Sequence, residues 1–259
     1  MVDLNCDLGE SFGAYRIGND EALLDVVSSA NIACGFHAGD PRVLERAVSA
    51  AAARGVGIGA HPGFPDLVGF GRRAIDADPV EVRTDVLYQL GAISAFCRAA
   101  GVALEHVKPH GALYNQALVD PRLAEAIASA VAAFDPRLIL VAIPGSQLAR
   151  AGERAGLTVA YEAFADRHYQ PDGTLVPRRQ TGATIHDPDE AARRVVRLVR
   201  EGKLTAVDGS ELTLRVHTVC LHGDHPEAVH VARAVRRELE RQGIAVEPLA
   251  VVLGRRSKR

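Results

Sequence analysis

The sequence is poor in sulfur and in aromatic side chains, with no tryptophan, one methionine and four cysteines. The cysteines, which are Cys6, Cys34, Cys97 and Cys220, show no Cys-x-x-Cys spacing, and this argues against a structural zinc knuckle and against a disulfide framework. We therefore expect buried thiols. Cys6 and Cys34 lie inside polar motifs, so the alternative of a thiol close to a functional site stays open.

An excess of either charge is also missing, because the formal net charge is -2 and the pI is ≈ 6.6. Nucleic-acid binding depends on Lys and Arg that neutralise phosphates, so we expect a small-molecule partner and no nucleic acid. The longest apolar run, 138–144, is far shorter than the ~18 residues of a membrane span. The first residues are acidic, where a signal peptide is basic and then apolar. We expect a cytoplasmic protein without a membrane segment.

Short apolar segments alternate with longer amphipathic stretches along the chain, which is typical of parallel strands covered by helices. Seven strands are expected, at residues 2–6, 30–34, 56–60, 106–108, 138–142, 158–162 and 217–221. Helices are expected where Asp or His precedes a proline that suits the first helical turn, over residues 42–54, 79–100, 121–133, 188–201 and 226–242. An Asp-Gly pair predicts a small hairpin within 205–214.

The usual nucleotide signatures are absent as well, both G-x-G-x-x-G after the first strand and G-x-x-x-x-G-K-[ST] anywhere. An open doubly wound sheet also fits the alternation, but this absence favours a closed β/α barrel. We predict a single barrel domain over residues 1–254 and a solvated basic tail over 255–259.

Polar, glycine-rich segments follow nearly every expected strand, at residues 5–10, 34–40, 59–63, 107–115, 162–167 and 221–225. Parallel strands of a barrel end at one rim, where their loops converge. One such segment would indicate a helix cap or a turn. Six of them predict a shared site for a small ligand.

The first four of these segments carry candidate acid, base or cation-binding groups. Asp7 and Glu10 are paired carboxylates that suit general acid-base chemistry or a cation, and capping of the next helix is the alternative. His37, His61 and His110 each follow a strand and lie close to a glycine, which leaves room for a ligand. Together they predict a functional cluster at the rim.

Lys108 lies two residues before His110, so both side chains are expected to face into the barrel. An inward lysine needs an anionic partner, which is either a structural carboxylate or a carboxylate or phosphate of a substrate. Tyr114 and Asn115 begin the adjoining helix, where they orient a ligand or serve packing and capping.

Asp166, Arg167 and Arg178 flank the loop 169–177, whose Pro-Asp-Gly turn makes it a candidate lid. Arg178 is suited to clamp an anion in a bidentate way, whereas for Arg167 a simple surface pair with Asp is an equal alternative. The histidines outside the rim segments, or beside stronger candidates, are interpreted as structural: His168, His186, His217, His225 and His230.

Six motifs resemble those of the LamB/YcsF family over nearly the whole chain: DLNCDLGE (3–10), ANIACGFHAGDP (30–41), IGAHPGFPDLVGFGRR (58–73), KPHGALYN (108–115), EAFAD (162–166) and HGD (222–224). The resemblance implies a distorted, TIM-like barrel of seven strands, related to the glycoside hydrolase/deacetylase superfamily. It also implies ATP-dependent cleavage of 5-oxo-L-proline to L-glutamate, with release of ADP and phosphate. That reaction implies ATP with Mg²⁺ and a complex with two further subunits, B and C, while the oligomeric state of this chain stays open.

The residues and the resemblance together predict two groups of site residues. The catalytic group is Asp7, Glu10, His61, Lys108 and His110. The substrate-binding group is His37, Asn115, Asp166, Arg178, His222 and Asp224. In this hypothesis the complex activates the lactam by phosphorylation, and a water poised by Asp7, His61 or His110 attacks it, while Lys108 and Arg178 hold the negative charges.

Two other functions stay open at this point. Asp7, His61 and His110 also resemble the Asp-His-His metal triad of barrel deacetylases, in which a divalent ion activates water. That resemblance implies a metal-dependent amide hydrolase or carbohydrate deacetylase. The third interpretation is a noncatalytic component that binds substrate or partners.

Overall fold

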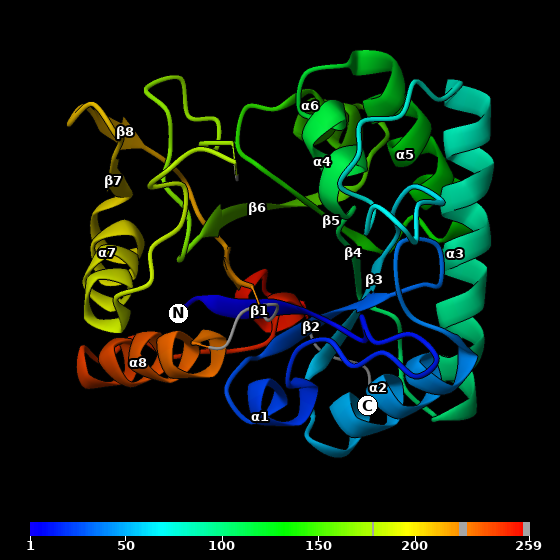
Figure 1. Cartoon of the computed structure of the whole chain (residues 1–259), viewed down its shortest axis with the longest axis horizontal. Helices are drawn as coiled ribbons and strands as arrows, with labels where there is room; N and C mark the ends of the chain where they lie inside the picture. Colours follow the sequence, from blue (N-terminus) through cyan, green and yellow to red (C-terminus); the bar gives the residue numbers. More distant parts are fainter. Residues whose placement is uncertain (178, 223–226, 256–259) are drawn as a thin grey trace.

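Seven parallel strands close into a barrel in the order β1-β2-β3-β4-β5-β6-β9 in the computed structural model, which describes residues 1–177, 179–222 and 227–255 (Figure 1). They are β1 (Asp3–Leu8), β2 (Ser29–Ala33), β3 (Gly57–His61), β4 (His106–Val107), β5 (Ile139–Ala142), β6 (Thr158–Phe164) and β9 (Thr218–Leu221). The predicted fold class is confirmed, and each predicted strand is present with ends shifted by at most two residues.

The pairing of β9 closes the barrel, because Thr218 is in register with Asp3 of β1 on one side and with Glu162 of β6 on the other. Side chains alternate along each strand. In β1 the alternation sends Asn5 into the interior, where its amide donates to Glu162. The intervening residues of β1, Leu4, Cys6 and Leu8, pack in the main hydrophobic core. A polar interior is thereby enclosed by an apolar shell.

Helices surround the barrel in Figure 1. They are α1 (Asp20–Leu24), α2 (Pro41–Ala53), α3 (Pro79–Ala99), α4 (Gly111–Ala117), α5 (Pro121–Phe134), α6 (Gln147–Arg154), α7 (Pro188–Glu201), α8 (Ala228–Arg241) and α9 (Leu249–Val252). An aspartate caps each of α2, α3, α5 and α7 ahead of a proline in the first turn, as the sequence predicts. No helix among the described residues is long and apolar enough to cross a membrane.

Two details of the prediction need adjustment. The last long helix, expected from residue 226, begins at Ala228 as α8, and residue 226 lies outside the described residues. The predicted hairpin is present as β7 (Lys203–Thr205) and β8 (Glu211–Thr213), two antiparallel strands that form a sheet separate from the barrel. The short helices α1, α6 and α9 were not predicted, because each spans few turns.

Gly59 makes room for a buried histidine inside the barrel. It lies opposite His106 in the β3-β4 register, and a Cβ atom at this position would overlap the His106 imidazole. His106 is fully buried, and its Nε2 is 2.9 Å from Oδ1 of Asn31. Burial lowers the pKa of His106 to about 3, so the ring is neutral at pH 7.

We expect Gly59→Ala to lower the free energy of unfolding by about 1–3 kcal/mol, because the added methyl group overpacks a fixed ring. Gly91 is the matched control: it is exposed within α3, and no atom lies within 4 Å of where its Cβ would be. Gly91→Ala is expected to raise the same quantity by about 0.5–1 kcal/mol, since glycine weakens a helix. Urea unfolding of both variants checks this, and a Gly59→Ala variant as stable as the Gly91→Ala variant would contradict it.

Candidate active site

Five predicted side chains gather where β1 to β4 end. Asp7 lies near the end of β1, His61 ends β3, and Lys108 directly follows β4. Glu10 lies in the segment after β1, and His110 is the N-cap residue of α4. All except Asp7 are buried, and Asp7 is partly buried. The parallel strands thus bring residues that are about a hundred positions apart in sequence into one cluster.

Lys108 is at the centre of a buried charge network. Its Nζ lies 3.0 Å from Oδ1 of Asp7, 3.0 Å from Oε1 of Glu162 and 2.9 Å from Sγ of Cys220. Burial alone would lower the pKa of Lys108, but the two carboxylates outweigh it and raise the pKa well above its ordinary value. Of the two partners that the sequence left open for this lysine, the structure shows carboxylates of the protein.

Asp7 joins this network to the histidines. Its Oδ1 accepts a hydrogen bond from Nδ2 of Asn31 at 2.9 Å, and its Oδ2 lies 3.3 Å from Nε2 of His61. Burial would raise the pKa of Asp7, yet His61 and Lys108 together hold it well below the ordinary value. Asp7 is therefore a carboxylate at neutral pH, and it acts through its charge more readily than as a proton donor.

The histidine cluster consists of Glu10, His37, His61 and His110. Nδ1 of His61 is 2.7 Å from the carbonyl oxygen of Lys108, and Nε2 of His110 is 2.8 Å from that of Phe70. A carbonyl oxygen only accepts, so each of these nitrogens carries the hydrogen. The other two nitrogens, Nε2 of His61 and Nδ1 of His110, face each other at 3.0 Å.

Glu10 and His37 complete the histidine cluster. Oε1 of Glu10 is 3.4 Å from Nε2 of His37 and 3.6 Å from Nδ1 of His110. The rings of His37 and His110 stack in parallel with centroids 3.7 Å apart. Burial lowers the pKa of both rings well below the ordinary value, and the nearby imidazoles add to the effect. Both rings are therefore neutral at pH 7.

Asp166 and His222 form a separate buried pair at the ends of β6 and β9. Nδ1 of His222 lies 2.9 Å from both carboxylate oxygens of Asp166, and the backbone N–H of His222 also donates to Asp166 at 3.2 Å. The ring of His222 stacks on Phe164 with centroids 5.5 Å apart. A carboxylate that holds one ring nitrogen fixes the orientation of the imidazole and leaves Nε2 for other contacts.

The remaining predicted residues lie elsewhere. Asn115 is exposed on α4, whereas its neighbour Tyr114 is buried and donates to Oε2 of Glu162 at 3.1 Å. Arg178 and Asp224 lie outside the described residues. The surface-pair interpretation of Arg167 is wrong: its side chain is buried and donates to the backbone carbonyl oxygens of Val176 and Ala183. Those bonds tie the proposed lid segment to the barrel.

Sequence reasoning missed the residues that occupy the barrel interior. Asn31 and Glu162 contact Asp7 and Lys108 directly, and the thiol of Cys220 contacts Nζ of Lys108. Burial raises the pKa of the Cys6, Cys34 and Cys220 thiols, so all three are protonated at neutral pH. The available signal was the position of polar residues within apolar strands.

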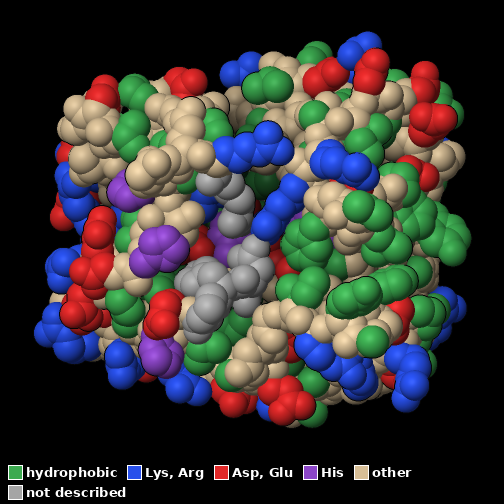
Figure 2. All heavy atoms as spheres, viewed as in Figure 1, with side chains coloured by type: hydrophobic (Ala, Val, Ile, Leu, Met, Phe, Trp, Pro, Cys, Tyr) green, Lys and Arg blue, Asp and Glu red, His purple; other side chains and the backbone are tan. Residues whose placement is uncertain are grey.

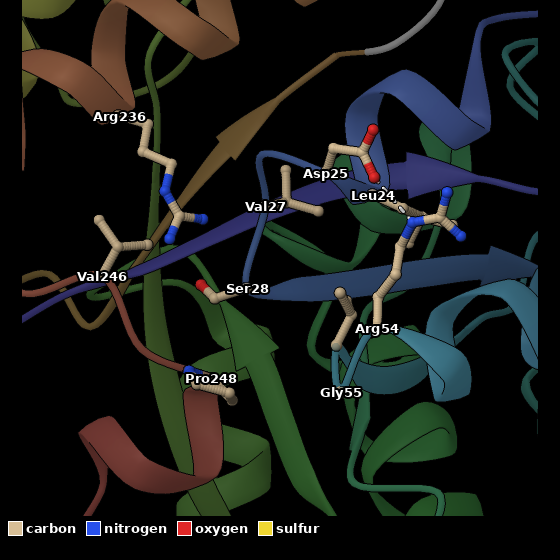
Figure 3. A pocket seen from close by; sticks show the side chains of 10 residues that line it. Leu24, Asp25, Val27, Ser28, Arg54, Gly55, Arg236, Val246 and Pro248 are labelled. Atoms are coloured by element: carbon tan, nitrogen blue, oxygen red, sulfur yellow. Dashed lines mark hydrogen bonds and ion pairs between the residues drawn. The ribbon is translucent and has the colours of Figure 1, made fainter.

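An open pocket at the N-terminal end of β2 is lined by none of the side chains of this cluster. Its volume is about 390 Å³, and Ser28, Arg54 and Arg236 are among the residues that line it (Figure 3). Arg54 pairs with Asp25 at 2.8 Å, and Arg236 pairs with Glu240 at 2.8 Å.

The face in Figure 2 is hollowed near its centre, with Lys or Arg side chains at the edge of the hollow.

Curated relatives of nearly equal length match this chain in sequence. The 5-oxoprolinase A subunit of Bacillus licheniformis is 57% identical over 247 residues, which cover 95% of this chain and 98% of the relative. The protein of the same name from Methylococcus capsulatus is 57% identical over 248 residues, with 96% and 95% covered.

Solved structures agree with this similarity. The "Lactam Utilization Protein" of Thermus thermophilus has 54% sequence identity and a TM-score of 0.91, with 95% of this chain and 98% of that chain covered. The catalytic domain of a peptidoglycan N-acetylglucosamine deacetylase from Eubacterium rectale shares the fold, at 13% identity and a TM-score of 0.50, with 97% and 89% covered.

The sequence model of the LamB/YcsF family matches residues 2–254, which is almost the entire chain. This match and the curated relatives at 50% to 57% identity lead to the same assignment. The chain belongs to the LamB/YcsF family.

Proposed function

We propose that this chain is the A component of an ATP-dependent 5-oxoprolinase, which opens the lactam ring of 5-oxo-L-proline to give L-glutamate while ATP is hydrolysed to ADP and phosphate. The observation that carries the proposal is the similarity over 95% of the chain to proteins named as the A subunit of 5-oxoprolinase, at up to 57% identity. A solved relative with 54% identity is named for lactam utilization. We further propose a cytoplasmic complex with subunits B and C.

The chemistry of a lactam explains why ATP is needed. A five-membered lactam is a resonance-stabilised amide and a poor electrophile, and phosphorylation of its oxygen makes its carbonyl carbon reactive. Water then adds to this carbon, and the ring nitrogen takes a proton and leaves as the amine. The acyl phosphate that results reacts with a second water to give glutamate and phosphate. ATP with Mg²⁺ supplies the phosphoryl group. This chain lacks the usual nucleotide-binding motifs, and subunits B and C are proposed to supply the nucleotide-binding site.

Within this chain, Asp7, His61 and His110 are the groups that activate the attacking water. Nε2 of His61 faces both Oδ2 of Asp7, at 3.3 Å, and Nδ1 of His110, at 3.0 Å. A negative carboxylate beside an imidazole stabilises the positive charge that develops when water loses a proton. Asp166 and His222, together with Asn115, Arg178, Asp224 and His37, are the proposed substrate-binding residues.

In this mechanism Lys108 positions other residues of the site and does not hold the substrate. Its ammonium already lies 3.0 Å from both Asp7 and Glu162, so its charge is balanced by the protein. We propose that Lys108 positions Asp7 and keeps it ionised. The deacetylase domain shares the fold of this chain. Its identity of 13% gives no reason to prefer a carbohydrate substrate.

The decisive experiment is a glutamate-release assay with 5-oxoproline and ATP, run on this chain with and without subunits B and C. We expect release only when all three subunits and ATP are present. No release from the complete mixture would overturn the proposed function.

Asp7→Asn separates a catalytic from a noncatalytic role for this chain. Loss of the charge beside His61 is expected to lower kcat of the assembled complex by about 10² or more, the usual range for general acid-base groups. Glu125→Gln, at a side chain that is 63% exposed on α5, is the matched control and should leave turnover unchanged. If Asp7→Asn complexes assemble and turn over at the wild-type rate, this chain binds without taking part in the chemistry.

Lys108→Met tests the positioning role through stability. It leaves Asp7 and Glu162 without their cation, so we expect a loss of about 3–5 kcal/mol in the free energy of unfolding at pH 7. Asp7 has a depressed pKa in the folded wild type, which stabilises the fold above its ordinary pKa of 3.8 and is lost as pH falls. The deficit of the variant should therefore shrink on acidification.

The double variant Lys108→Met/Glu162→Gln removes one of the two unpaired charges and is expected to recover part of that stability. Urea unfolding at pH 7 and at pH 3 measures both effects, because the contribution of Asp7 is lost below its ordinary pKa of 3.8. A single variant that loses the same free energy at both pH values, with no recovery in the double variant, would show that the loss comes from packing rather than from charge.

A further inference from the structure

We propose that Glu10, His61 and His110 form a site for one divalent transition-metal ion, with an open position for a water or a substrate oxygen. The donor atoms are Oε1 of Glu10, Nε2 of His61 and Nδ1 of His110. With His37, these residues form a group whose candidate ligand atoms all lie within 4.8 Å of one another. The proposal concerns the isolated chain and stands whether or not the substrate is 5-oxoproline.

The hydrogen bonds of the two imidazoles give the first argument. Carbonyl oxygens of Lys108 and Phe70 fix the hydrogens on Nδ1 of His61 and on Nε2 of His110. The nitrogens left over both present lone pairs to one point, 3.0 Å apart. Two lone pairs repel at this distance unless a positive group lies between them. Backbone carbonyls behind ligating histidines are also the usual way to fix their tautomers in metal sites.

The spacing of the donor atoms gives the second argument. Ligands of a tetrahedral zinc ion at 2.0–2.1 Å lie about 3.3 Å from each other. The observed separations are 3.0 Å between the two imidazole nitrogens and 3.6 Å between Glu10 and His110. Two histidines, one glutamate and an open position also match a common arrangement of catalytic zinc.

Asp7 is not part of this group of convergent donors. Its Oδ1 is engaged by Lys108 and Asn31. A second group of convergent donors consists of Asp7, Cys220 and His222. The ammonium group of Lys108 already supplies a positive charge there, since its Nζ contacts both Asp7 and Cys220. The proposed ligands therefore differ from the triad Asp7, His61 and His110 that the deacetylase resemblance implies.

His37 positions the ligands rather than joining them. Its ring is parallel to that of His110, and a lone pair in a parallel plane does not converge on the same point. Nε2 of His37 lies 3.4 Å from Oε1 of Glu10, so the ring supports both donors from one side. Imidazole and carboxylate ligands suit zinc, cobalt and nickel. An ion held here lowers the pKa of a bound water.

The test measures metal on the isolated chain, without ATP or 5-oxoproline. Protein purified without a metal-affinity tag is stripped with a chelator, dialysed, and titrated with zinc by isothermal calorimetry, with bound zinc counted by mass spectrometry. We expect one equivalent of zinc and a melting temperature that rises with zinc concentration, because the ion binds the folded state.

Variants identify the ligands. Glu10→Gln and His110→Ala should each weaken zinc binding more than 100-fold, whereas Asp7→Asn and His37→Ala should weaken it by about 10-fold, as expected for groups that only support ligands. His230→Ala, at an exposed histidine on α8, is the control and should bind as the wild type does. Circular dichroism confirms that each variant is folded.

Three results would overturn the proposal. Wild-type protein that takes up no zinc, cobalt or nickel would show that a proton shared between His61 and His110 accounts for their contact. Equal loss of binding in Asp7→Asn and Glu10→Gln would assign the ion to the deacetylase-like triad instead. Zinc binding by His110→Ala that is as tight as in the wild type would show that the ion binds at a different site. None of these results depends on glutamate release, so the metal and the substrate are tested separately.

Discussion

The ammonium group of Lys108, buried between Asp7 and Glu162, is the interaction on which the interior of the barrel depends. Each of these charges would be costly to bury alone, and the contacts of 3.0 Å on both sides offset that cost. The pairing also spans the barrel, because Lys108 follows β4 while Asp7 is on β1 and Glu162 is on β6. A closed barrel brings these strands into reach of one side chain, which an open sheet of the same strands would not do.

Much of the fold is predictable from local sequence. Aspartate-proline pairs give the starts of α2, α3, α5 and α7, since the carboxylate caps free amides and proline suits the first turn. Strand positions follow from short apolar runs. Barrel closure is a long-range property: Thr218 pairs with both Asp3 and Glu162, and no local pattern encodes that register. The family resemblance and the missing nucleotide signatures indicated it instead.

The candidate site was predictable where a side chain follows a strand and lies close to glycine, as His37, His61 and His110 do. Asn31 was missed because it lies inside a strand, where a single polar residue resembles an interruption of the core. Glu162 begins the polar segment 162–167, but nothing in the sequence singled it out from its neighbours. Their partners come from other strands, so their role appears only after closure. Asn115 belongs to a rim motif, and helix geometry turns its neighbour Tyr114 inward and leaves Asn115 exposed.

Charge balance links the network of Lys108 to the histidine cluster. One ammonium faces two carboxylates, so Asp7 and Glu162 leave an excess negative charge in a buried region. Burial makes His37 and His110 neutral, and they supply no compensation. The missing positive charge is best placed beside Oδ2 of Asp7, where Nε2 of His61 lies at 3.3 Å. A dication held by Glu10, His61 and His110 would supply a positive charge at this point. Metal ligands bind in their deprotonated form, so zinc binding to the isolated chain is expected to weaken on acidification.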